Sequence, residues 1–309
     1  LHGAGTVIAT VVSSRALRPN TAILLAVLCM SIGPFVFGIA VAGTIGVGLI
    51  SVQAVTIPVV IAALAGAIGY MSIAAWLKLP SSATQAFIGS IVGAATAGFG
   101  TQAIVADGLI KALLALLLSP LLGILAGYLV VKLSYRATKT ATPEVNRWFK
   151  NGQVAISVLV ATAFGSNDGQ KVMGILALGI LATQTTDSQF TIPYWAAAFA
   201  ALAMAVGTVM GSKRVIKTLG ARLYRVQPIH GFGAQTASGL VLLSASLLGS
   251  PVSGSQVIAS AIVGAGSAER VRMVRWGMFR QILGTWVLTM PASALAGAGI
   301  CLLLTSLMR

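Results

Sequence analysis

The chain has 309 residues, of which 57% are hydrophobic and only 8% are charged. In a water-soluble domain roughly a quarter of all residues are charged, and they cover its surface. This composition therefore excludes a soluble globular protein and indicates a polytopic membrane protein. The net charge of +15 does not indicate nucleic acid as a partner, since the basic residues stand in short loops between apolar runs and no aromatic, basic groove is visible.

The predicted elements are apolar segments of membrane-spanning length, and they define an all-α fold with about 10 membrane segments. The first, "LHGAGTVIATVVSS", reads as the second half of a segment, so we expect that the start of the protein is missing from this sequence. In chain order the segments cover about 1–14, 21–49, 52–77, 80–100, 108–131, 152–183, 192–211, 229–249, 251–266 and 281–308.

The loops between these segments differ in charge. If each segment crosses the membrane once, every basic loop falls on one side, and the positive-inside rule places that side in the cytoplasm. We therefore predict a multi-pass protein of the cell (plasma) membrane, with Lys139 and Arg222 in the cytoplasm and Asp187 outside. The basic loops are Arg15–Arg18, Lys78, Lys132–Lys150, Lys213–Arg225 and Arg270–Arg280.

Two segments resemble each other. "PSSATQAFIGSIVGAA" (80–95) and "PVSGSQVIASAIVGAG" (251–266) share Pro-x-Ser-x-x-Gln and then IVGA without gaps. Paired, Pro-interrupted segments in opposite orientation are typical of secondary transporters with inverted repeats and broken or re-entrant helices. The alternative is that small-residue helices look alike by chance. The repeat predicts a first transmembrane repeat at 1–135, a basic cytoplasmic loop at 136–151 and a second repeat at 152–309.

The stretch "FGSNDGQKVMG" (164–174) places polar side chains in the middle of the long segment 152–183. Its glycines predict a helix that is broken at this point. Ionisable groups at membrane depth mark ion or substrate pathways, so we predict a coupling-ion site there. The alternative is an ion pair that only holds helices together. The candidate residues are Asn167, Asp168, Gln170 and Lys171.

The two Pro-x-Ser elements also supply hydroxyl groups where a helix restarts. Hydroxyls beside the positive end of a helix dipole can bind an oxyanion, and two facing elements suit a tetrahedral one. The alternative is ordinary helix capping. The candidate residues are Ser81, Ser82, Thr84, Ser253 and Ser255.

Enzyme chemistry finds no support. The sequence has no HExxH motif, no Walker loop, no GxSxG and no Cys/His cluster. Cys29 and Cys301 lie far apart in apolar runs and are interpreted as packing residues. We therefore predict no catalytic residue, no bound metal and no cofactor beyond a coupling ion, Na⁺ or H⁺.

Taken together, these motifs resemble the PiT family of inorganic phosphate transporters. "FGSNDGQKVMG" resembles its second-repeat signature, "PSSATQ" and "PVSGSQ" resemble its two P-x-S elements, and "HGFGAQTASGL" resembles a further conserved stretch. The resemblance implies inverted repeats and transport of phosphate with Na⁺ or H⁺. It assigns phosphate to the five hydroxyl residues, joined by Gln85 and Gln256 at the family's His positions, and the coupling ion to Asp168 and Asn167.

The chain also departs from the family pattern. Gly3 and Thr6 stand at the Asp and Asn positions of the first-repeat signature, and Gln235 stands at a Glu position. Lys171 stands where other members have Asn, next to the implied cation site. The position of Lys171 favours H⁺ over Na⁺ as the coupling ion, or a transporter whose driving ion acts only through Asp168.

The predicted function is a symporter for inorganic phosphate in the lipid bilayer. Two alternatives stay open, namely the same scaffold with another oxyanion such as sulfate, and a transport-dead or regulatory membrane homologue. A homodimer and a cytoplasmic accessory protein are also left open as partners.

Overall fold

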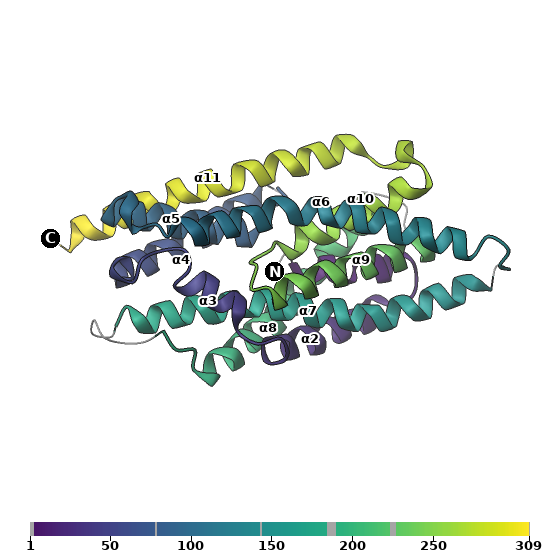
Figure 1. Cartoon of the computed structure of the whole chain (residues 1–309), viewed down its shortest axis with the longest axis horizontal. Helices are drawn as coiled ribbons and strands as arrows, with labels where there is room; N and C mark the ends of the chain where they lie inside the picture. The colour runs from purple at the N-terminus through teal and green to yellow at the C-terminus, as the bar shows by residue number, and fades with distance from the viewer. Residues whose placement is uncertain (1–2, 78, 143, 184–189, 223–226, 309) are drawn as a thin grey trace.

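The computed structural model describes residues 3–77, 79–142, 144–183, 190–222 and 227–308 (Figure 1). Within these ranges the chain forms helices and one isolated β-bridge, between Ile50 and Ile104. The helices are α1 (Gly3–Ser13), α2 (Pro19–Val36), α3 (Ala40–Gly46), η1 (Val52–Ala54), α4 (Ile57–Trp76), α5 (Ala83–Phe99), η2 (Thr101–Ala103), α6 (Ala106–Ala137), α7 (Val145–Leu181), α8 (Tyr194–Arg222), α9 (Pro228–Leu247), α10 (Gly254–Glu269), η3 (Val271–Met273) and α11 (Trp276–Leu307).

Long apolar helices cover the outside of the bundle. Within the described residues, 5 helices are long and apolar enough to cross a membrane: α2, α4, α6, the first part of α8, and α11. Large apolar side chains on α6 and α11 are exposed, for example Leu117, Leu121, Leu295 and Leu303. A soluble protein would not expose such surfaces, so the prediction of an all-helical membrane protein is confirmed.

The second half of the chain repeats the elements of the first. α4 begins at Ile57 and α9 begins 171 positions later at Pro228, and both have 20 residues. Each is followed by a short helix, α5 with 17 residues or α10 with 16, and then by a helix of 32 residues, α6 or α11. The two long helices run in opposite directions (Figure 1). The predicted inverted repeats are therefore confirmed.

The short helices are re-entrant. α4 and α5 form one hairpin, α9 and α10 form the other, and the turn of each hairpin lies inside the protein. The Ser82 hydroxyl, at the start of α5, donates a hydrogen bond of 2.9 Å to the Ser253 hydroxyl at the start of α10. Both side chains are buried. The two Pro-x-Ser elements thus meet at the centre of the bundle.

Each re-entrant helix packs against the long helix of the other repeat. α5 lies on α11, and a methyl group at Gly93 would collide with the carbonyl oxygen of Ala294. α10 lies on α6, and a methyl group at Gly264 would collide with the carbonyl oxygen of Ile124. Such close backbone approach is the usual use of glycine between helices in lipid, and it joins the two repeats.

The predicted break in the helix at the polar cluster is wrong. α7 is continuous over 37 residues from Val145 to Leu181. Its glycines serve packing instead, because Gly165 faces the backbone of Met30 on α2 and Gly174 faces Ala42 on α3. The break occurs in the predicted segment 21–49, where the chain between α2 and α3 turns at Gly38 with φ +75°.

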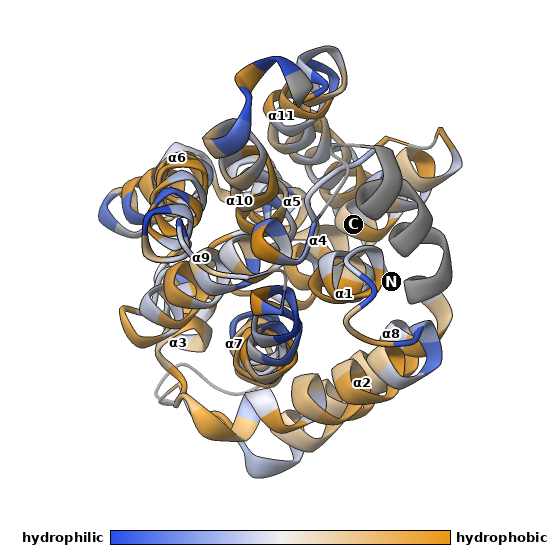
Figure 2. Cartoon of the chain, turned by 90° about the vertical axis from the view of Figure 1, so that its right-hand side faces the viewer, coloured by the Kyte–Doolittle hydropathy of each residue, from blue (hydrophilic) through white to orange (hydrophobic). Residues whose placement is uncertain are grey.

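Basic residues gather at one end of the bundle, the end that faces the viewer in Figure 2. The end of α6 carries Lys132 and Arg136, and the start of α7 carries Arg147 and Lys150. Because α7 begins at Val145, the connection between α6 and α7 is shorter than the predicted loop 136–151. Asp187 lies outside the described residues, and Arg222 is described only as the last residue of α8. The boundaries of the repeats stay a prediction.

Candidate functional site

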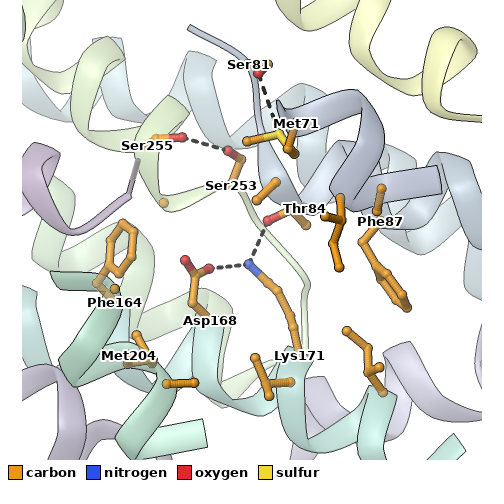
Figure 3. Close-up of a pocket in the computed structure, with 18 of the residues that line it drawn as sticks. Met71, Ser81, Thr84, Phe87, Phe164, Asp168, Lys171, Met204, Ser253 and Ser255 are labelled. Carbon is orange, nitrogen blue, oxygen red and sulfur yellow. Dashed lines mark hydrogen bonds and ion pairs between the residues drawn. The ribbon is translucent and has the colours of Figure 1, made fainter. Parts of the chain in front are cut away.

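A cavity of about 530 Å³ lies where the two hairpins meet α7 and α8 (Figure 3). Its walls are mainly apolar and include Met71, Phe87, Phe164 and Met204. A few polar groups converge in it, which is the usual composition of a small-molecule site. The predicted site residues that line it are Ser81, Thr84, Asp168, Lys171, Ser253 and Ser255.

Lys171 is the centre of the polar contacts in this cavity. Its ammonium donates to Asp168 Oδ1 at 2.7 Å, to Thr84 Oγ1 at 2.8 Å and to the carbonyl oxygen of Val252 at 2.6 Å. A lysine ammonium has three N–H donors, so these contacts satisfy all of them. They come from α7, α5 and the α9–α10 turn, and therefore join both hairpins to α7.

Asp168 and Lys171 form an ion pair one turn apart on α7, as their spacing predicts. The side chain of Asp168 is 32% exposed and that of Lys171 is 9% exposed. The carboxylate therefore faces the open cavity while the ammonium is covered. With both groups charged the pair is neutral, so the positive potential for an anion must come from the helix termini unless Asp168 takes up a proton.

Hydroxyl groups connect the two helix starts. Ser82 caps α5, because its hydroxyl accepts from the backbone N–H of Gln85 at 3.3 Å, and it also donates to Ser253. Ser253 makes no such cap on α10, and its hydroxyl lies 3.3 Å from that of Ser255. The alternative of ordinary helix capping therefore explains the position of Ser82 but not that of Ser253. The N-terminal ends of α5 and α10 point toward one centre, where their dipoles favour negative charge.

The other predicted site residues lie away from the cavity. Gln170 accepts from the backbone N–H of Val41 at 2.8 Å, which fixes the start of α3. Asn167 donates to the carbonyl oxygen of Ser250 at 3.2 Å, in the α9–α10 turn. Gln85 and Gln256 stand in the first turns of α5 and α10. Among the described residues no partner is found for Gln85 Oε1 or for either amide atom of Gln256.

Sequence reasoning missed two contributors to this site. The carbonyl oxygen of Val252 accepts from Lys171, and it is free to do so because the chain is not helical between α9 and α10. The stretch "PVSG" (251–254) was the sequence signal for this break between helices. α8 supplies Met204 and Thr208 to the cavity wall, and its apolar sequence gave no signal.

Gln235 lies outside the cavity, between α9 and α1. Its amide nitrogen donates to the carbonyl oxygen of Val7 at 2.7 Å and to Thr10 Oγ1 at 2.8 Å. The amide therefore holds two helices together with a neutral donor, where a carboxylate would need a cation or proton between the same oxygens. Among the described residues, no group of three or more His, Cys, Asp or Glu could hold a metal ion.

Inverted hairpins that meet at a cavity with converging polar groups are typical of the class of secondary transporters, in which the site lies at the interface of the repeats. The comparisons identify the family. The model of the phosphate transporter family matches residues 1–297, and the chain belongs to this family. Membership of a transporter family confirms the prediction that the chain is not an enzyme.

Curated relatives cover nearly the whole chain. A "probable low-affinity inorganic phosphate transporter" of Rhizobium meliloti is 39% identical over 300 residues, which are 96% of this chain and 90% of that protein. The protein of the same description in Bacillus subtilis is 35% identical, with the same coverage. A solved structure titled "The sodium-dependent phosphate transporter" superposes with a TM-score of 0.88 at 20% identity, over 99% of this chain and 94% of that one. At that identity the likeness shows a shared fold.

Proposed function

We propose that the chain is an H⁺-coupled symporter that carries inorganic phosphate across the cytoplasmic membrane. The family and the descriptions of its relatives support phosphate as the substrate. The observation that carries the proposal is the contact between Ser82 and Ser253, because it brings the N-terminal ends of two inverted helices to one buried cavity.

Phosphate binding follows from the groups around that contact. A tetrahedral anion needs donors from several directions, and the starts of α5 and α10 approach from opposite sides. The hydroxyls of Ser253 and Ser255 can donate to a phosphate oxygen and can also accept from a protonated one. Sulfate carries no proton at neutral pH, so it would use these hydroxyls less fully.

The charge of the cavity supports proton coupling. Among the described residues that line the cavity, the acidic one is Asp168. When Asp168 is ionised it neutralises Lys171. When it takes up a proton, the cavity gains the full positive charge of the ammonium and attracts phosphate. Proton and phosphate would thus favour each other's binding, which is the linkage that a symporter needs.

The function is tested with purified protein in proteoliposomes, by the initial rate of ³²P-phosphate uptake. We expect an inward H⁺ gradient to drive uptake, a Na⁺ gradient alone to drive none, and an equal concentration of sulfate to inhibit weakly. Ser253→Ala should weaken phosphate binding by about 1–3 kcal/mol, because a hydrogen bond to a charged ligand is lost.

Ser267→Ala is the matched control, because Ser267 lies on the same helix, its hydroxyl donates to the carbonyl oxygen of Val263, and it does not line the cavity. Uptake that requires Na⁺ would contradict proton coupling. Strong competition by sulfate would support the other oxyanion, and the absence of uptake under either gradient would support the transport-dead alternative.

We also propose that the basic end of the bundle faces the cytoplasm. The support is the gathering of Lys and Arg side chains at that end, which the positive-inside rule assigns to the cytoplasm. In a background without Cys29 and Cys301, Lys139→Cys should resist a membrane-impermeant thiol reagent in intact cells, while Gln102→Cys at the opposite end should react. Both positions are exposed. Labelling of position 139 but not 102 would reverse the orientation.

A further inference from the structure

The Lys171 ammonium is surrounded by oxygen atoms. Its three partners are a carboxylate oxygen, a hydroxyl oxygen and a backbone carbonyl oxygen, all within 2.6–2.8 Å. Oxygen ligands of these kinds hold hard metal cations in proteins. The lysine stem reaches this position from α7 alone, whereas the ligands come from α7, α5 and the α9–α10 turn, as Figure 3 shows for Asp168 and Thr84.

A structural ion pair would not need this arrangement. One contact to Asp168 would neutralise the ammonium, yet the ammonium also donates to Thr84 and to Val252. The Thr84 hydroxyl in turn donates a hydrogen bond of 3.3 Å to the carbonyl oxygen of Val252. The positive charge therefore lies between the two hairpins, at the junction on which the cavity depends. A diffusible cation at this point would be available to leave, whereas Lys171 is covalently retained.

We propose that the Lys171 ammonium occupies a built-in monovalent cation site, and that shortening this side chain opens the site to a free cation such as Na⁺ or methylammonium. Asp168 Oδ1, Thr84 Oγ1 and the carbonyl oxygen of Val252 are the ligands. The transport consequence rests on the proposed function: uptake by the shortened variant becomes dependent on the added cation. The binding consequence does not rest on it.

The physical reason lies in what the shortened variant leaves behind. In Lys171→Ala, the Asp168 carboxylate, the Thr84 hydroxyl and the Val252 carbonyl oxygen remain close together without a positive charge between them. A small cation that enters the space restores the contacts. Lys171→Met loses the same charge but fills the space with an apolar chain of similar length, so it should leave no room for a cation.

The experiment measures thermal unfolding of the purified variants in detergent, with NaCl or methylammonium chloride titrated against N-methylglucamine chloride at constant ionic strength. Lys171→Ala should show a saturable rise in its unfolding temperature, because a ligand that binds only the folded state stabilises it. Wild type, Lys171→Met and the double variant Asp168→Asn/Lys171→Ala should show none. In proteoliposomes, the same cation should raise uptake by Lys171→Ala on the order of tenfold, a typical coupling between two ligands.

Each outcome decides. If Lys171→Ala responds to cations no more than wild type does, or if Lys171→Met responds equally, the proposal is overturned. If Lys171→Ala unfolds without added cation, it is purified in NaCl: unfolding on removal of the salt supports the site, and unfolding that no cation prevents overturns it. If wild type transports no phosphate, the proposed function fails while the unfolding measurement still tests the site.

Discussion

Asp168→Asn abolishes proton-driven phosphate uptake while the protein stays folded. We expect the initial rate under an inward H⁺ gradient to fall on the order of a hundredfold, near the upper end of the usual coupling between two sites. The measurement is ³²P-phosphate uptake against external pH, for wild type and variant, beside thermal unfolding in detergent.

The reason is that asparagine keeps the shape and one acceptor oxygen of the carboxylate but cannot take up or release a proton. Lys171 keeps its contacts to Thr84 and Val252, so the packing between the hairpins survives. The cavity then carries the ammonium charge at every pH. Phosphate can bind, but nothing makes its release depend on the proton.

Asp107→Asn is the control, because Asp107 is exposed in the first turn of α6 and does not line this cavity. It should transport like wild type. Normal gradient-driven uptake by Asp168→Asn would reduce the ion pair to a structural role. If Asp168→Asn unfolds, Asp168→Glu is used instead, because it keeps a carboxylate. A shifted pH dependence of phosphate uptake in Asp168→Glu would support the coupling role of Asp168.

Gly93→Ala destabilises the protein, although alanine is the better helix former. A methyl group at this position collides with the carbonyl oxygen of Ala294, so α5 and α11 must separate. Overpacking of this kind costs about 1–3 kcal/mol, against a gain of up to about 1 kcal/mol in helix propensity. We expect a lower unfolding temperature in detergent and less monodisperse protein on gel filtration.

Gly299→Ala is the matched control. Gly299 also lies within a helix, α11, but a methyl group placed there would meet no atom of another described segment within 4 Å. It should unfold at the wild-type temperature or slightly above. Equal stability of both variants would show that α5 and α11 can separate without cost.

Much of the architecture could be predicted because it depends on local patterns. Composition gives the membrane class, and the repeated Pro-x-Ser-x-x-Gln elements give the two re-entrant helices and their inversion. The breaks between helices could not be placed as well. Glycine both interrupts helices and lets them approach each other, and the sequence does not distinguish Gly165, which packs on Met30, from Gly38, which turns the chain.

The site shows the same division. The spacing of Asp168 and Lys171 predicts their contact, because residues three apart share a helix face. Asn167 and Gln170 belong to the same cluster in sequence, yet Asn167 faces the α9–α10 turn and Gln170 faces α3. Which face of α7 meets a cavity depends on packing from distant segments, and so does the role of the Val252 carbonyl. Neither feature can be predicted from a single sequence.

The exchange of partners between the repeats bears on how such a protein could have arisen. α5 needs α11 and α10 needs α6, so one repeat by itself would leave its re-entrant helix without the surface that covers it. A half-length ancestor would therefore have worked as an antiparallel pair of identical subunits. The protein from its single gene would have had to insert into the membrane in both orientations, which requires nearly balanced numbers of Lys and Arg at the two ends of the bundle. Only after the two halves were fused could Lys and Arg collect at one end.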